Sequence, residues 1–181
     1  MDESIFQAEI RESIKYLYPV SHYKKIPDPS KFDVNNTIKR PYDGYFVSRD
    51  QFVSFEYKII KEPISFPFDR VDDNQIYNLL CVAQNFQLAL LLINYRFNLS
   101  EKQMQKYSVE NDKHNFTLCL EIAKFLQLKK LYKHFLFKKS IPFEYIWELY
   151  QKKSNLIINW EKIGEQYIWN LKPIIEVRGG L

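Results

Sequence analysis

Apolar residues recur at helical spacing near the start of the chain and then fill two strand-like segments. The first pattern predicts an amphipathic helix over residues 4–17, which Pro19 ends. Residues 44–47 and 52–60 predict two strands joined by a turn, because aromatic and β-branched side chains fill both. Between residues 20 and 40 we expect an irregular excursion with room for one short strand.

The rest of the chain alternates a long apolar run with helical patterns. Asp72 or Asp73 can cap a helix that runs to about Asn85. Further along we predict a buried central strand at 88–97, helices at 117–137 and 142–150, and short strands at 107–109 and 172–177. This order of elements predicts a mixed α/β fold with a central sheet flanked by helices.

The composition indicates one folded domain in a chain of 181 residues. A hydrophobic fraction of 46% excludes a disordered protein, and no internal repeat marks a boundary. Cys81 and Cys119 lack the spacing of metal ligands, so we interpret them as buried hydrophobic side chains. Because the N-terminus lacks a secretory signal and the longest apolar run is too short to span a bilayer, we expect a cytoplasmic protein without a membrane partner.

Positive charge is concentrated late in the chain. The whole chain carries a net charge of +4, whereas the segment from Glu121 to Lys153 holds eight lysines against three glutamates, which is +5. A basic stripe interleaved with aromatic residues is typical of a DNA-binding face, although a solvated helix surface has the same pattern. We predict a Lys-rich helical C-terminal part, about residues 114–181, whose DNA-binding residues are Lys124, Lys129, Lys130, Lys133, Lys138 and Lys139.

Two acids and a lysine gather at the ends of the two N-terminal strands. Glu56 and Lys58 share one face of their strand, and Phe55 and Tyr57 share the other. Asp43 can approach Glu56 across the hairpin, since neighbouring strands lie about 4.8 Å apart. Buried acids are costly unless a cation lies between them, and carboxylate oxygens favour Mg²⁺. The pattern predicts metal-assisted phosphodiester cleavage, with an exposed Glu-x-Lys pair on an edge strand as the alternative.

The sequence around these residues resembles the RecU-type Holliday junction resolvases of the PD-(D/E)xK nuclease superfamily. Five segments carry the resemblance: Asp43-Gly44, Ser54-Phe55-Glu56-Tyr57-Lys58, Phe66-Pro67-Phe68, Asn74-Gln75-Ile76 and Lys139-Ser140-Ile141-Pro142. The gap of 19 positions from Glu56 to Gln75 also fits the family. The resemblance implies a restriction-endonuclease-like fold in a single nuclease domain spanning residues 1–181.

The resemblance also implies a role for each matching residue. Asp43, Glu56 and Gln75 would bind Mg²⁺, which Mn²⁺ could replace, and Lys58 would stabilise the transition state. Glu9 is an auxiliary candidate in the first helix, with Glu3 nearby and a plain solvated glutamate as the alternative. The family acts as a homodimer whose two sites cut opposed strands of a four-way DNA junction, so the implied partners are branched DNA and a second copy.

Two departures from the family pattern leave other functions open. Pro41 stands where the family has a metal-assisting threonine, and residues 20–40 are shorter than the family's junction-piercing segment. One alternative is a nuclease that accepts linear, nicked or single-stranded DNA. A second is a DNA-binding module without turnover, and the last is an oligomeric interaction protein that binds no nucleic acid.

Overall fold

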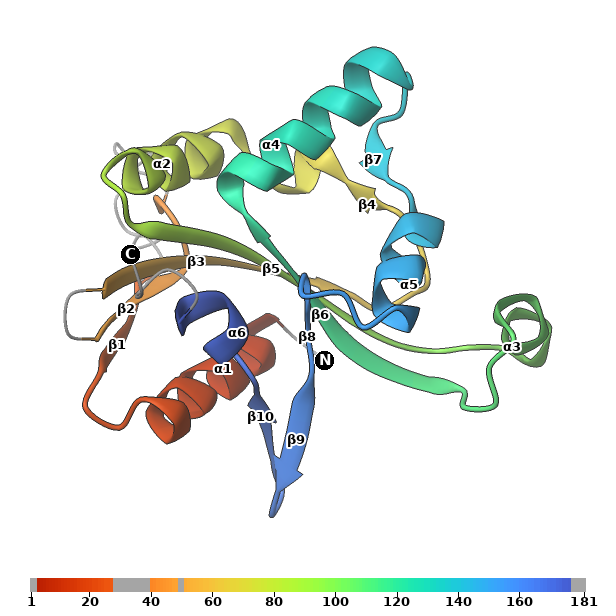
Figure 1. Cartoon of the computed structure of the whole chain (residues 1–181), viewed down its shortest axis with the longest axis horizontal. Coiled ribbons are helices and arrows are strands. Elements are labelled where there is room, and N and C mark those ends of the chain that lie inside the picture. Colours follow the sequence, from red (N-terminus) through yellow and green to blue (C-terminus); the bar gives the residue numbers. More distant parts are fainter. Residues whose placement is uncertain (1–2, 28–39, 49–50, 177–181) are drawn as a thin grey trace, which may run out of the picture.

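A six-stranded mixed sheet runs through the computed structural model, which describes residues 3–27, 40–48 and 51–176 (Figure 1). Its strands lie across the sheet in chain order: β1 (His22–Lys25), β2 (Gly44–Ser48), β3 (Gln51–Ile60), β5 (Leu88–Asn98), β6 (Lys113–Glu121) and β8 (Ile157–Ile158). Neighbouring strands are antiparallel except β3 and β5, which are parallel.

Helices cover both faces of this sheet (Figure 1). One face carries α2 (Asp73–Gln84), α4 (Ile122–Lys130) and α5 (Phe143–Gln151). The other carries α1 (Glu3–Leu17), α6 (Lys172–Ile175) and the hairpin of β9 (Trp160–Ile163) and β10 (Gln166–Trp169). The smaller elements are β4 (Phe66–Pro67), the 3-10 helix η1 (Phe68–Arg70), α3 (Glu101–Tyr107), the π-helix η2 (Leu131–Phe135) and β7 (Ser140–Ile141), which pairs with β4. The predicted α/β architecture is therefore confirmed.

Side-chain alternation divides the core into two clusters. On β5, Leu91 belongs to the cluster beneath α2 and α4, whereas Leu92 belongs to the cluster beneath α1. Burial on both faces explains why the sequence of β5 is apolar without a break. On β3, Phe55 and Tyr57 belong to the α1 cluster. Glu56 lies between them in the chain and points to the α2 side, as strand periodicity predicts.

Most predicted elements are confirmed with shifts of one or two residues at their ends. The helix over 4–17 is α1, the two N-terminal strands are β2 and β3, and the apolar run is β5. The helices at 72–85 and 142–150 are α2 and α5, and the short strand allowed between 20 and 40 is β1. The rest of that excursion and the centre of the β2–β3 turn lie outside the described residues, which omit 28–39 and 49–50.

The helix expected over residues 117–137 is wrong in its first part. Residues 113–121 instead pair with β5 along its length as strand β6, and the helix begins at Ile122. Within β6, the buried Phe116, Leu118 and Leu120 alternate along one face, a period-two signal that the overlapping helical pattern concealed. Because β6, β8, β9 and β10 all lie after residue 112, the C-terminal part is mixed and not simply helical.

Two predicted short strands are also wrong. Residue 107 ends helix α3, which starts at a capping box formed by Ser100 and Gln103, and Ser108 then takes a left-handed conformation. The segment expected at 172–177 forms α6, with Pro173 in its first turn, and residue 177 lies outside the described part. Within the described ranges, no helix combines the length and the apolar character needed to cross a membrane.

Candidate metal centre

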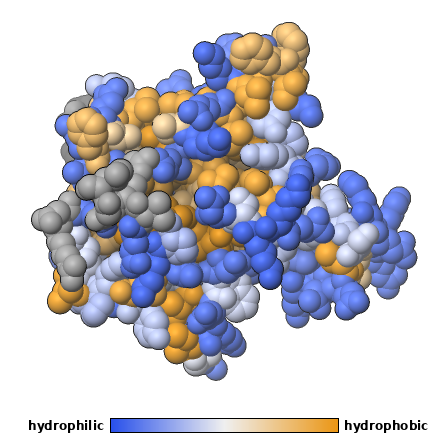
Figure 2. Space-filling view, viewed as in Figure 1, coloured by the Kyte–Doolittle hydropathy of each residue, from blue (hydrophilic) through white to orange (hydrophobic). Residues whose placement is uncertain are grey.

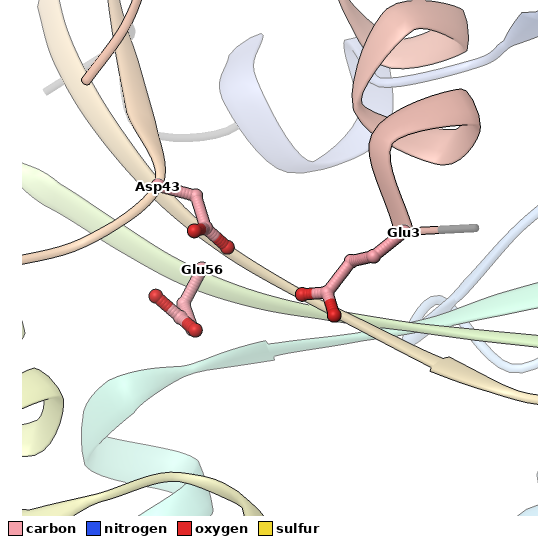
Figure 3. A group of neighbouring side chains, drawn as sticks. All are labelled: Glu3, Asp43 and Glu56. Carbon is pink, nitrogen blue, oxygen red and sulfur yellow. The ribbon is translucent and has the colours of Figure 1, made fainter. Parts of the chain in front are cut away.

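Three carboxylates from separate parts of the chain converge beside the sheet (Figure 3). Glu3 comes from the first turn of α1, Asp43 directly precedes β2, and Glu56 lies in the middle of β3. One oxygen from each lies within 4.8 Å of the other two. Oxygens at this separation can contact one hard cation together.

Main-chain contacts fix Asp43 at the open end of the β2–β3 hairpin. Its N–H donates to the carbonyl of Phe55 at 3.0 Å, and its Oδ2 accepts from the N–H of Tyr57 at 2.9 Å. Arg40 Nη1 lies 3.2 Å from Oδ1, and Asp43 is only 2% exposed. The predicted approach of Asp43 to Glu56 across the hairpin is therefore present, and a main-chain N–H of β3 and the side chain of Arg40 hold the carboxylate.

Gly44 lets the edge strand come close to this carboxylate. A Cβ atom at Gly44 would lie 2.9 Å from the Tyr23 hydroxyl and 3.1 Å from the Lys24 carbonyl, closer than side chains allow. Tyr23 also lies with its hydroxyl 3.4 Å from that of Tyr57. The glycine after Asp43 thus allows β1 to pack against the strand that carries the acid.

Glu56 is fully buried and incompletely paired. Its Oε1 accepts from Lys58 Nζ at 2.6 Å and from Gln75 Nε2 at 2.5 Å. Among the described residues, its buried Oε2 has no hydrogen-bond partner. Burial raises the pKa of Glu56 to about 7, and Asp43 adds to this rise while Lys58 opposes it. Without a cation, this carboxylate therefore takes up a proton near neutral pH.

Gln75 reaches the site as predicted, but it presents the wrong atom for a metal ligand. Asp72 caps α2 by accepting from the Gln75 N–H at 2.9 Å, and Gln75 Oε1 accepts from the Asp72 N–H in return at 3.1 Å. The capping box engages the oxygen and leaves the amide nitrogen facing Glu56. In this arrangement Gln75 contacts Glu56 through its N–H, and its role as a metal or water ligand stays a prediction.

Glu3 takes the place in the cluster that the sequence resemblance suggested for Glu9. Burial raises the pKa of Glu3, Lys58 lowers it and Asp43 raises it, so Glu3 shares the electrostatic environment of the cluster. Both glutamates lie on the first helix, and its apolar periodicity contains no signal that distinguishes them. Only the direction in which α1 crosses the sheet brings the first turn to Asp43 and Glu56.

Glu9 forms a separate ion pair. Its carboxylate binds Arg96 of β5 with two contacts of 3.0 Å and 2.7 Å, and it accepts from the indole N–H of Trp169 at 3.1 Å. Six residues advance a helix by about 9 Å and turn it to another face, which separates Glu9 from Glu3. Glu3 therefore lies in the acidic cluster where Glu9 was the auxiliary candidate, and Glu9 ties α1 to β5 and β10.

The six predicted DNA-binding lysines divide by position. Lys129, Lys133 and Lys139 line one pocket of 470 Å³ with residues 68, 69 and 71–73, which lead into α2. Lys124 lines a different pocket near Pro173 of α6. The remaining two, Lys130 and Lys138, are exposed. Only the first group lies next to the helix whose Gln75 contacts Glu56.

The donor set fits a hard divalent cation. It offers three carboxylates. On Glu56, Lys58 and Gln75 bind Oε1, and the buried Oε2 has no partner among the described residues. No protein-family model matches the chain, and no curated protein matches it either. The case for a function therefore rests on this geometry and on the motifs in the sequence.

Proposed function

We propose that this chain is a Mg²⁺-dependent DNA endonuclease that hydrolyses phosphodiester bonds in branched DNA. The finer form of the proposal is a restriction-endonuclease-like domain of the RecU type that resolves four-way junctions as a homodimer. One observation carries it: carboxylate oxygens of Glu3, Asp43 and Glu56 lie within 4.8 Å of one another with Lys58 alongside, and Glu56 keeps a buried oxygen without a partner among the described residues. Mn²⁺, which has similar ligand preferences, would substitute for Mg²⁺.

The residues of the site have separable roles in this chemistry. Glu3, Asp43 and Glu56 would hold Mg²⁺, which supplies a bound water of lowered pKa and neutralises charge on the scissile phosphate. Gln75 keeps Glu56 oriented through its N–H. Lys58 lies 2.6 Å from Glu56 and places an ammonium group beside the site, where it can stabilise negative charge that develops on the phosphate.

The first test replaces the two most buried acids by isosteric amides. Asp43→Asn and Glu56→Gln remove charge without changing volume, so we expect both variants to fold and to bind DNA. Both should cleave labelled four-way junctions in Mg²⁺ no faster than the wild type does in chelator. Asp112→Asn, at an exposed residue in the turn before β6, is the control and should cleave normally. Full cleavage by Asp43→Asn or Glu56→Gln would overturn the proposal.

A substrate panel then separates the proposal from its alternatives. The wild type is given a four-way junction, a flap, a linear duplex and a single strand, each with Mg²⁺ and with chelator. Preferential cleavage of the junction supports the RecU-type assignment, and equal cleavage of every substrate supports a tolerant nuclease. Binding without product in Mg²⁺ or Mn²⁺ would leave a non-catalytic DNA-binding module. Light scattering with and without DNA tests the homodimer.

A further inference from the structure

An exposed apolar tip ends the helix that carries the lysine pocket. Leu131, Phe135, Leu136 and Phe137 are 46%, 66%, 49% and 89% exposed, and we call these four residues the apolar tip. Figure 2 shows apolar side chains gathered at the top of the view, where α4 and η2 end in Figure 1. Adjacent large apolar side chains in water mark an interaction site more often than single ones do.

Buried contacts hold the base of the tip. Tyr132 is 8% exposed and packs against Phe68 and Tyr145, with ring centroids 6.5 Å and 6.3 Å away. The chain returns to the protein just beyond the tip, where the carbonyl of Lys139 accepts from the N–H of Phe68 and Ser140 begins strand β7. The tip is thus a projection with a fixed base on both sides.

The backbone turns sharply through the tip itself. Leu136 N–H donates to the carbonyl of Leu131 at 3.2 Å, and Lys138 N–H donates to the carbonyl of Tyr132 at 2.8 Å. Between these bonds Phe137 has a φ of 52°, a left-handed conformation that is unfavourable for an aromatic residue. A left-handed residue directly after a helix is a common C-terminal ending, and here it accompanies a Phe137 ring that lies in solvent.

The tip is embedded in positive charge. Between Glu121 and Glu144 the chain has six lysines and no acid. Three of those lysines line the 470 Å³ pocket, together with Asp69, Asp72 and Asp73. Asp72 caps α2 there, and Asp73 lies 3.9 Å from Lys129. Cations beside exposed aromatic rings complement single-stranded nucleic acid, whose phosphates and base faces bind these two kinds of group.

We propose that the rings of Phe135 and Phe137 stack on unpaired bases at a branch point in DNA, while Lys129, Lys133 and Lys139 hold the neighbouring phosphates. This inference rests on the proposed nuclease function, because it makes the tip the part of the protein that selects branched over linear DNA. Lys133 of the lysine pocket lies between Leu131 and Phe135 in the chain. The other side of the pocket is formed by residues at the start of α2, whose Gln75 contacts Glu56. A DNA strand is favoured over a lipid surface because the lysines beside the tip share this pocket with the start of the helix that contacts Glu56.

The chain provides a matched control for the aromatic rings. Phe86 is 97% exposed and has a φ of 58°, so it shares both the exposure and the backbone conformation of Phe137. It follows α2 between Asn85 and Gln87, away from the lysine cluster in the sequence. Replacing Phe86 by alanine therefore removes an equivalent ring without the surrounding positive charge.

The experiment compares the wild type, Phe86→Ala and the double variant Phe135→Ala/Phe137→Ala. Binding is measured in chelator to a linear duplex and to a flapped duplex that carries 2-aminopurine beside the branch. We expect the wild type and Phe86→Ala to quench the 2-aminopurine and to prefer the flap. The double variant should lose the quenching and about tenfold or more of the flap affinity, with duplex affinity unchanged. Equal melting temperatures would show that all three proteins are folded.

Several results would overturn the inference. The double variant could keep its quenching and its preference for the flap. The wild type could bind phosphatidylserine vesicles through the tip and no flap, or it could form a dimer that only the double variant loses. The proposed function is tested separately in Mg²⁺: a wild type that shows ring-dependent flap binding without cleavage supports the tip and rejects the nuclease. If the double variant cleaves with unaltered substrate preference, the proposed role of the tip is wrong and the nuclease function is not affected.

Discussion

Two glutamates of helix α1 have negative charges that are compensated to different extents. Glu9 has a bidentate Arg96 and an indole N–H, which satisfy both of its oxygens. The cluster of Glu3, Asp43 and Glu56 brings three carboxylates together, and Lys58 bonds to only one oxygen of Glu56. The pair of Glu9 and Arg96 is electrically neutral, whereas the cluster sets three carboxylates against two neighbouring cations, Lys58 and Arg40.

This difference separates a structural ion pair from a site that accepts a cation. A buried ion pair with good geometry needs nothing further, and removing one partner leaves an uncompensated charge. Clustered carboxylates raise one another's pKa and become fully ionised only when a cation joins them. Burial of an acid alone therefore does not distinguish an ion pair from a cation site. The number of carboxylate oxygens left without a partner does distinguish them.

Lys58, beside Glu56, and Arg96, beside Glu9, should differ most in their effect on cleavage. Lys58→Met should lower Mg²⁺-dependent cleavage by roughly 10²- to 10³-fold, because it removes the ammonium that stabilises developing charge. Arg96→Met should destabilise the fold but leave cleavage by the folded fraction unchanged. Single-turnover rates at saturating Mg²⁺ measure the effect. A rate for Lys58→Met within threefold of the wild type would contradict the role of Lys58.

Replacing Glu9 should affect stability, whereas replacing Glu3 should affect Mg²⁺ affinity. Glu9→Gln leaves Arg96 without its charge partner, so we expect the free energy of unfolding to fall by about 3 kcal/mol. Glu3→Gln should change stability little and weaken Mg²⁺ binding about tenfold, since it removes one ligand and some repulsion. Urea unfolding at several Mg²⁺ concentrations measures both quantities. If Glu9→Gln weakened Mg²⁺ binding instead, the assignment of Glu3 to the site would be wrong.

The raised pKa of Glu56 makes the metal-free protein less stable as the pH rises. The folded-state pKa of about 7 exceeds the usual value of 4.5, so the folded state binds the extra proton between these values. The stabilisation is present below about pH 4.5 and is lost as the pH rises through 7. In chelator at pH 8, Glu56→Gln should therefore be more stable than the wild type by about 2 kcal/mol. If Glu56→Gln were less stable than the wild type, ionisation of Glu56 would not destabilise the folded protein.

Two capping-box glutamines provide the smallest and most specific comparison. Gln75 and Gln103 occupy the same position in α2 and α3, but only Gln75 contacts Glu56. Replacing either by methionine should cost about 1 kcal/mol of stability through the lost cap. Only Gln75→Met should also weaken Mg²⁺ binding, by about tenfold, because it frees Glu56 to rotate. Equal metal affinities in the two variants would show that Gln75 serves the helix alone.

Local patterns in the sequence predicted much of the fold and part of the site. Strand periodicity placed Glu56 and Lys58 on one face, and the hairpin spacing brought Asp43 to Glu56. The same reasoning failed over residues 117–121, which belong to a strand that lies between two long-range partners, β5 and β8. Pairing with those strands determines the conformation there, and neither strand is adjacent in the chain.

Periodicity along the chain establishes which residues can face the same way, because side-chain direction repeats every two residues in a strand and every 3.6 in a helix. It thereby identified Asp43, Glu56 and Lys58 as candidates for one site. Long-range packing was needed to bring Glu3 and not Glu9 to the acidic cluster. It also turned the nitrogen of Gln75 towards Glu56 and left the ring of Phe137 in water. These outcomes depend on how separate elements cross and on which groups lose contact with water, and both are set by contacts over the whole chain.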